Sequence, residues 1–224
     1  MLAAVFLLAS HLGIASSGLR PWLVQRLGAR LYLGAYSVLA LAAIIWLVRA
    51  YNRADFVLLW SPAPWQAWLP LIIMPFALLF LFGGLTTPNP TVAGQALVEK
   101  KIDPPKGMLR ITRHPTMWAF GLWALSHLIA NGDLASLFLF GTIAALALVG
   151  TVLIDARYRD RLSTHWSSFS EQTSNLPFAA IITGRQQFDF GEIGWWRVAL
   201  ALGLYIALLL IHPWLFSVSP FGIS

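Results

Sequence analysis

Long apolar segments alternate with short polar ones along most of the chain. Six of them approach the roughly 20 mostly apolar residues that a membrane-spanning helix needs, at 1–19, 31–48, 66–86, 115–131, 134–154 and 195–215. The pattern predicts an all-α fold, a polytopic membrane helix bundle of about six transmembrane helices in a single domain over residues 1–224. Asn131-Gly132-Asp133 is good turn chemistry, so we expect the fourth and fifth helices to form a tight hairpin.

The composition agrees with a membrane protein. Of the 224 residues, 58% are hydrophobic and only 11% are charged, and the mean hydropathy is +0.71. A soluble domain carries roughly 25% charged residues, so a soluble protein with a large core is excluded. The chain has no cysteine. This excludes disulfides, iron–sulfur clusters, thiolate ligation of haem and a cysteine nucleophile.

The basic residues predict the orientation. Segments 18–30, 87–114 and 155–197 together hold 13 Lys and Arg, whereas the opposite side has only Arg49 and Arg53. The positive-inside rule therefore puts these three segments in the cytoplasm and both termini in the periplasm of a bacterial inner membrane. The net charge of +6 then reflects topology, and we expect a lipid bilayer and no nucleic acid as partner. The part at 155–194 is interpreted as a long segment lying on the headgroups.

Two histidines lie inside otherwise apolar predicted helices, His11 in the first and His127 in the fourth. A polar group in a bilayer core is costly, so each marks a candidate functional site. Neutral imidazole is also a common axial ligand of haem iron. The alternative is that each ring only hydrogen-bonds a neighbouring helix. His212, near the outer end of the last helix, fits an interfacial residue better than a ligand.

The predicted topology puts these two histidines at similar depth. His11 lies about 15 Å from the outer start of its helix, and His127 lies about 18 Å from the inner edge. In a hydrocarbon core of about 30 Å, both are then near the midplane. We therefore predict that the two imidazoles share one metal site.

A second cluster lies in the polar segment before the fourth helix. Pro115 suits the first position of a helix, which makes His114 the candidate N-cap. Arg110 and Arg113 add fixed positive charge at a helix N-terminus, which itself attracts anions. This cluster could bind the acidic groups of a cofactor, such as haem propionates, or the lipid phosphates of the inner interface. Asp155, at the inner end of the fifth helix, is either a partner for one of these arginines or a simple boundary charge.

Four segments together resemble the NnrU family of membrane proteins. They are residues 10–20, Arg110-Ile111-Thr112-Arg113-His114-Pro115, Leu122-Trp123-Ala124-Leu125-Ser126-His127-Leu128 and Asn131-Gly132-Asp133. The family is associated with nitrite and nitric oxide metabolism in denitrifying bacteria. It also includes the plant 15-cis-zeta-carotene isomerase, a haem b protein with histidine ligands. The resemblance implies haem b as the cofactor and His11 and His127 as its metal ligands.

Three function classes stay open at this point. The resemblance implies either a haem-dependent cis–trans isomerase of a hydrophobic polyene or a non-enzymatic protein that handles haem or nitric oxide in denitrification. Membrane methyltransferases of the isoprenylcysteine carboxyl type are a rival resemblance, because there an Arg-His-Pro before a helical hairpin helps to bind S-adenosylmethionine. They usually carry a tyrosine two residues after that proline and paired glutamates after the hairpin. This chain has Met117 and Asp155-Ala156 at those places, which weakens the methyltransferase alternative.

Overall fold

The computed structural model describes residues 1–14, 17–91 and 104–221, which form helices joined by turns and loops. In chain order they are α1 (Leu2–Leu8), the π-helical turn η1 (Ala9–Gly13), α3 (Leu19–Leu27), α4 (Ala29–Asn52), the 3₁₀ turn η2 (Pro64–Ala67), α5 (Trp68–Thr86), α6 (Met108–Ile111), α7 (Pro115–Asn131), α8 (Leu134–Gln172), α9 (Ala179–Ile182), α10 (Phe190–Ile193) and α11 (Trp195–Phe216). The predicted all-α fold is confirmed. Lys100 and Lys101 of the predicted cytoplasmic side, and Ala15 and Ser16 of the segment 10–20, lie outside the described residues.

Four helical stretches are long and apolar enough to cross a membrane. They cover Ala29–Asn52, Pro64–Thr86, Leu134–Arg159 and Trp195–Phe216. The helix predicted at 115–131 is α7, which has the expected bounds but only 17 residues. The first apolar helix, Leu2–Gly13, is too short to span a bilayer core of about 30 Å as a straight helix. The structure thus supports a membrane protein with four clear spans, two fewer than the pattern predicts.

Helix α8 is longer than predicted. Its sequence was expected to leave the helix near residue 154, yet α8 continues to Gln172. The reason is that the polar part of α8 contains no Pro or Gly and carries a small apolar face. Trp166 and Phe169, three residues apart, are buried together with Leu109. The first part of 155–194 is therefore helical up to Gln172, and its position on the headgroups stays a prediction.

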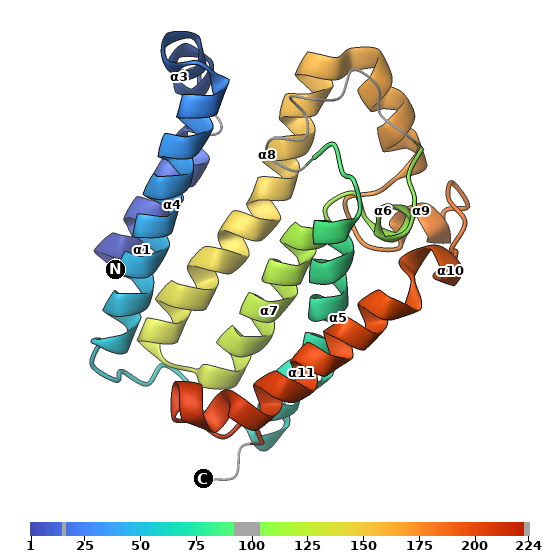
Figure 1. Ribbon diagram of the computed structural model, residues 1–224. Coiled ribbons are helices and arrows are strands. Elements are labelled where there is room, and N and C mark those ends of the chain that lie inside the picture. Colours follow the sequence, from blue (N-terminus) through green and yellow to red (C-terminus); the bar gives the residue numbers. More distant parts are fainter. Residues whose placement is uncertain (15–16, 92–103, 222–224) are drawn as a thin grey trace.

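The helices are arranged around α7 and α8. Helix α7 packs between α5 and α8, α11 packs against α5, and the pair α1 and α4 lies beyond α8 (Figure 1). The turn between α7 and α8 closes one end of the molecule, which we call the hairpin end. The short helices α6, α9 and α10 gather at the other end, which we call the α6 end (Figure 1).

The predicted hairpin turn is confirmed. Gly132 ends α7 in the left-handed conformation with φ +76°, and a Cβ there would lie 2.3 Å from the carbonyl oxygen of Trp60. Asp133 then caps α8, because its side chain accepts a hydrogen bond of 2.9 Å from the backbone N–H of Ser136. Glycine is therefore required at this turn both for its dihedral angles and for the approach of the preceding loop.

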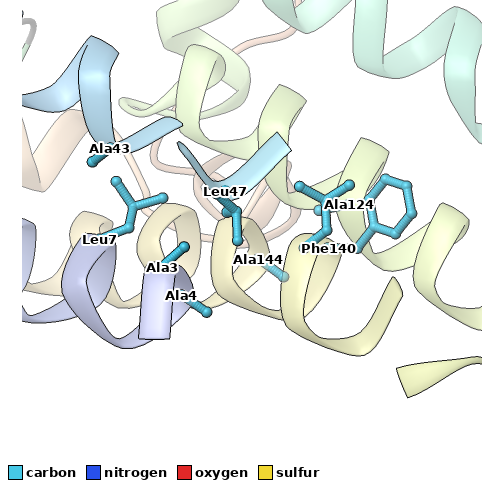
Figure 2. Close-up of a cluster of buried hydrophobic side chains, with 9 residues drawn as sticks. Ala3, Ala4, Leu7, Ala43, Leu47, Ala124, Phe140 and Ala144 are labelled. Atoms are coloured by element: carbon cyan, nitrogen blue, oxygen red, sulfur yellow. The ribbon is translucent and has the colours of Figure 1, made fainter. Parts of the chain in front are cut away.

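One apolar core joins the α1–α4 pair to the hairpin of α7 and α8. Leu7 of α1, Leu47 of α4 and Phe140 of α8 are buried in it, together with small residues that include Ala124 of α7. Figure 2 shows these side chains meeting from four helices. The small alanines let the helices approach closely, as is usual where helices pack inside a bilayer. This core fixes α1 and α4 against the hairpin of α7 and α8.

Candidate functional site

A large cavity of about 1600 Å³ lies between the α1–α4 pair and helices α5, α7, α8 and α11. It exceeds the roughly 300–1,000 Å³ of ordinary small-molecule pockets, and its lining is mainly apolar. All four histidines whose side chains the structure describes line it, namely His11, His114, His127 and His212. The side chain of His165 lies outside the described part of the chain. The residues singled out from sequence as possible metal ligands therefore share one chamber.

His11 lies in the π-helical turn η1. Its Nδ1 is 3.1 Å from the carbonyl oxygen of Leu7, four residues earlier, and its ring packs against Tyr36 with 5.3 Å between centroids. Single π-helical turns inside α-helices are frequent at functional sites because they re-aim one side chain. With the Nδ1 proton donated to the carbonyl, Nε2 is the ring atom with a free lone pair.

His127 repeats this arrangement on α7. Its Nδ1 is 2.8 Å from the carbonyl oxygen of Trp123, again four residues earlier. The ring packs against two aromatic side chains that also contact each other, with centroid distances of 5.7 Å to Trp123 and 5.4 Å to Phe140. A histidine that ligates a metal usually donates its other ring N–H in this way, which fixes the tautomer and the ring orientation. Asn131 donates to the backbone carbonyl of His127 rather than to its ring.

The two histidines lie at different levels of the cavity. His11 contacts Tyr36, which is 11 residues, or about 16 Å along α4, before Leu47 of the core that holds Phe140. His11 is therefore nearer the α6 end than His127, and the equal depth expected from sequence is not found. However, helical side chains point back toward the N-terminus of their own helix. Because α1 and α7 run in opposite directions (Figure 1), this rule tilts the side chain of His11 toward the hairpin end and that of His127 toward the α6 end.

Arg110 is engaged away from the cavity. Its guanidinium makes a bidentate ion pair with the carboxylate of Glu192 on α10, with N–O distances of 2.7 Å and 2.9 Å. It also donates a hydrogen bond of 2.8 Å to the side-chain oxygen of Gln186. This pair holds the pKa of Glu192 at about 2, below its usual value of 4.5. Arg110 does not line the cavity formed by the described residues. Its role in the structure is to tie α6 to the segment that precedes α11.

Arg113 and His114 share one carboxylate. Arg113 donates to Asp155 at 2.7 Å, and His114 Nε2 lies 2.6 Å from the other oxygen of Asp155. Of the two alternatives for Asp155, the arginine partner is the one found. Burial lowers the pKa of His114, so the ring is neutral at pH 7 and donates its Nε2 proton to Asp155.

His114 is the N-cap of α7, with Pro115 at the first helical position, as predicted. Its side chain is fully buried, and its Nδ1 has no hydrogen-bond partner among the described residues. His114 lines the cavity, whereas Arg113 does not within the described part of the chain. The predicted basic cluster is thus divided, with only His114 facing the chamber.

The sequence analysis missed several polar residues of the cavity wall. Arg20, Tyr32, Tyr36 and Arg157 line it toward the α6 end. His212, which the sequence suggested is an interfacial residue, also lines the cavity. His212 Nδ1 lies 2.8 Å from the carbonyl oxygen of Val218, and the ring is within electrostatic range of His127. The spacing of four residues between the two tyrosines was a visible signal, since it places both on one helix face. Nothing in the sequence showed that Arg20 of α3 and Arg157 of α8 line the same cavity.

Fold and cavity together define a helical membrane protein with an internal chamber that is apolar, rich in histidine and open over part of its wall. The chain belongs to the NnrU family, whose model matches residues 1–220.

Two curated relatives carry the same name. The "15-cis-zeta-carotene isomerase, chloroplastic" of Zea mays is 27% identical over 230 aligned residues, which cover 95% of this chain and 59% of that protein. The protein of that name from Arabidopsis thaliana is 32% identical over 133 residues, which cover 50% of this chain and 33% of the relative. The chain thus spans about three-fifths or less of the length of these relatives. No solved structure matches.

Proposed function

We propose that the protein binds haem b in the cavity, with His11 and His127 as axial ligands, and isomerises a double bond of an apolar polyene. The single observation that supports this most is the matching hydrogen bonding of the two rings. In both, Nδ1 is bonded to the carbonyl four residues earlier, which leaves Nε2 as the ligand atom inside one chamber. The isomerase part rests on the similarity to the two zeta-carotene isomerases.

The types of side chain on the cavity wall support a porphyrin as its ligand. Neutral imidazoles are suitable ligands for its iron, and the rings of Tyr36, Trp123 and Phe140 beside them offer flat apolar contacts. A cavity of about 1600 Å³ leaves room for an elongated apolar substrate beside a cofactor. Its open side would let such a substrate enter from the bilayer.

When bound, haem iron would supply a Lewis-acid or one-electron centre, at which a polyene double bond could rotate without net oxidation. The protein's part is to hold the two imidazoles, to exclude water with apolar walls and to align the substrate. If both His11 and His127 hold the iron, one of the two rings would have to move before a substrate could reach it.

An absorption spectrum of the detergent-purified protein tests the haem site. We expect a Soret band of a low-spin haem, which disappears or becomes high-spin in both His11→Ala and His127→Ala. His212→Ala is the informative comparison, because His212 lines the same cavity and lies near His127. A spectrum lost in His212→Ala but unchanged in His11→Ala would contradict the ligand assignment. Isomerisation is then tested by chromatography of a cis-polyene incubated with the haem-loaded protein.

The association of the NnrU family, to which the chain belongs, with denitrification suggests a second candidate, a non-enzymatic role in nitrite or nitric oxide metabolism. Here the dissociation of one histidine would admit nitric oxide instead of a polyene. Titration of the reduced protein with nitric oxide, followed by its spectrum, separates the two. Tight nitric oxide binding without any conversion of cis-polyenes would favour the accessory role.

A further inference from the structure

A chain of polar and aromatic side chains leads from His11 toward the α6 end of the cavity. The His11 ring packs on Tyr36 at 5.3 Å, Tyr36 stacks on Tyr32 at 5.8 Å, and the Arg20 guanidinium lies 5.7 Å from the Tyr32 ring. These residues come from η1, α4 and α3, and all of them line the cavity. His11, the candidate iron ligand, is thus linked through Tyr36 and Tyr32 to Arg20 on the same wall of the cavity.

A second arginine joins this group from α8. Arg157 also lines the cavity, and the charges of both Arg20 and Arg157 reach the hydroxyl of Tyr36. The described residues of the cavity wall include no Asp or Glu. Two guanidiniums and two phenols, those of Tyr32 and Tyr36, therefore lie on the described wall of the cavity toward the α6 end. Guanidinium and phenol groups are the usual donors to a carboxylate.

The arginines proposed from sequence for this task are engaged elsewhere. Arg110 is paired with Glu192, and Arg113 is paired with Asp155, and neither lines the cavity formed by the described residues. An amphipathic ligand of the cavity therefore meets Arg20 and Arg157 rather than Arg110 and Arg113.

We infer that Arg20 and Arg157, with the hydroxyls of Tyr32 and Tyr36, bind the carboxylate end of the ligand that occupies the cavity. This inference rests on the proposed haem site, and there the carboxylates are the two propionates of haem b. The arrangement gives the ligand one orientation, with its acidic edge toward the α6 end and its apolar edge toward the hairpin end. Such an orientation leaves the apolar, open part of the cavity for the substrate.

The test compares two porphyrins that differ only in charge. The full-length protein is prepared without haem in phosphatidylcholine nanodiscs, which carry no anionic lipid, and is titrated with haem b or with its dimethyl ester. Arg20→Gln and Arg157→Gln should each bind haem b about tenfold more weakly, the loss expected for one hydrogen bond between charged groups. Both variants should bind the dimethyl ester as the wild type does. Arg20→Lys, which keeps the charge, should recover part of the affinity for haem b.

Matched controls come from the same helices. Arg26→Gln on α3 and Arg159→Gln on α8 change exposed arginines that do not line the described cavity. Both should bind the two porphyrins like the wild type. Size-exclusion profiles of all variants show whether the fold is kept.

Three outcomes separate the hypotheses. Unchanged haem affinity in Arg20→Gln and Arg157→Gln overturns the inference while leaving the haem site intact. An equal loss for haem and for its ester also overturns it, because the arginines would then act on the fold or on lipid phosphates. A wild-type protein that binds neither porphyrin refutes the proposed function and this inference with it.

Discussion

At the scale of single residues, the ion-pair partners of a side chain, rather than its chemical type, decide whether it faces the cavity. Arg110, Arg113 and Arg20 carry the same group, yet only Arg20 faces the chamber, because Glu192 and Asp155 hold the other two outside it. His11 and His127 were identifiable from sequence, since a polar side chain in an apolar helix is costly. The partners of the arginines were not, because α8 and α10 supply them from 42 and 82 residues away.

Asp155 is the shared partner in a buried polar cluster. Its carboxylate accepts from both Arg113 and His114, whose side chains are 13% and 0% exposed. Asp155→Asn should cost about 3–5 kcal/mol, because it leaves the charge of Arg113 buried without its counter-charge. Reversible unfolding in mixed detergent micelles measures this loss.

Asp55→Asn is the matched control for Asp155→Asn, since Asp55 is exposed. We expect its unfolding free energy to stay within about 0.5 kcal/mol of the wild type. Equal stability of the two variants would show that the carboxylate of Asp155 does not hold Arg113 and His114 in place.

The Arg110–Glu192 pair predicts a dependence of stability on acid. The pKa of Glu192 is about 2 in the folded protein, mainly because of Arg110, and near its usual 4.5 in the unfolded chain, so the unfolded state takes up the proton first. The contribution of the pair is complete above about pH 4.5 and is lost as the pH falls toward 2. Glu192→Gln should remove this part of the pH dependence while lowering stability at pH 7. Melting temperatures of both proteins at several pH values between 3 and 7 measure the effect.

At the scale of helices, the apolar pattern predicted where α4, α5, α7 and α11 lie to within a few residues, because burial in a bilayer requires long uninterrupted apolar runs. The apolar pattern failed where burial of a few aromatic side chains or a local change of helix type determines the structure. Helix α8 continues into polar sequence because Trp166 and Phe169 are buried at its end. In the region predicted as a helix at 1–19, the structure has a short α1 followed by a π-helical turn. The hydrophobic periodicity of the sequence gives no signal for such a turn.

Close packing of α5 on α7 depends on Gly84. A Cβ at this position would lie 2.3 Å from Thr116 Oγ1 and 2.7 Å from the Thr116 backbone nitrogen, so backbone must move to accept it. Gly84→Ala should therefore destabilise the protein by about 1–3 kcal/mol, as overpacking does elsewhere. Gly203→Ala on α11 is the control, since nothing lies within 4 Å of its Cβ position, and it should leave stability unchanged or slightly raised. Equal melting temperatures would show that α5 and α7 are not tightly packed at Gly84.

At the scale of the whole molecule, the cavity and the charge distribution lead to one orientation. Arg20 and Arg157 lie at the α6 end, as do Arg110 and Arg113, whereas Arg49 and Arg53 are near the hairpin end of α4. The positive-inside rule predicts that the α6 end faces the cytoplasm. Six membrane crossings with both termini in the periplasm stay a prediction. Helices α1 and α7 are short for a span, so they would cross only where the bilayer is thinned or water enters the cavity.

Cysteine labelling tests this orientation directly, because the natural chain contains no cysteine that would have to be removed. Ser61 lies in the exposed loop between α4 and η2 at the hairpin end, and Ser168 is exposed in the extension of α8 at the α6 end. In spheroplasts of a bacterial host, a membrane-impermeant maleimide should label Ser61→Cys at once and Ser168→Cys only after lysis. The opposite pattern would place the α6 end in the periplasm. The proposed carboxylate-binding arginines would then face the periplasm, whereas haem is synthesised in the cytoplasm.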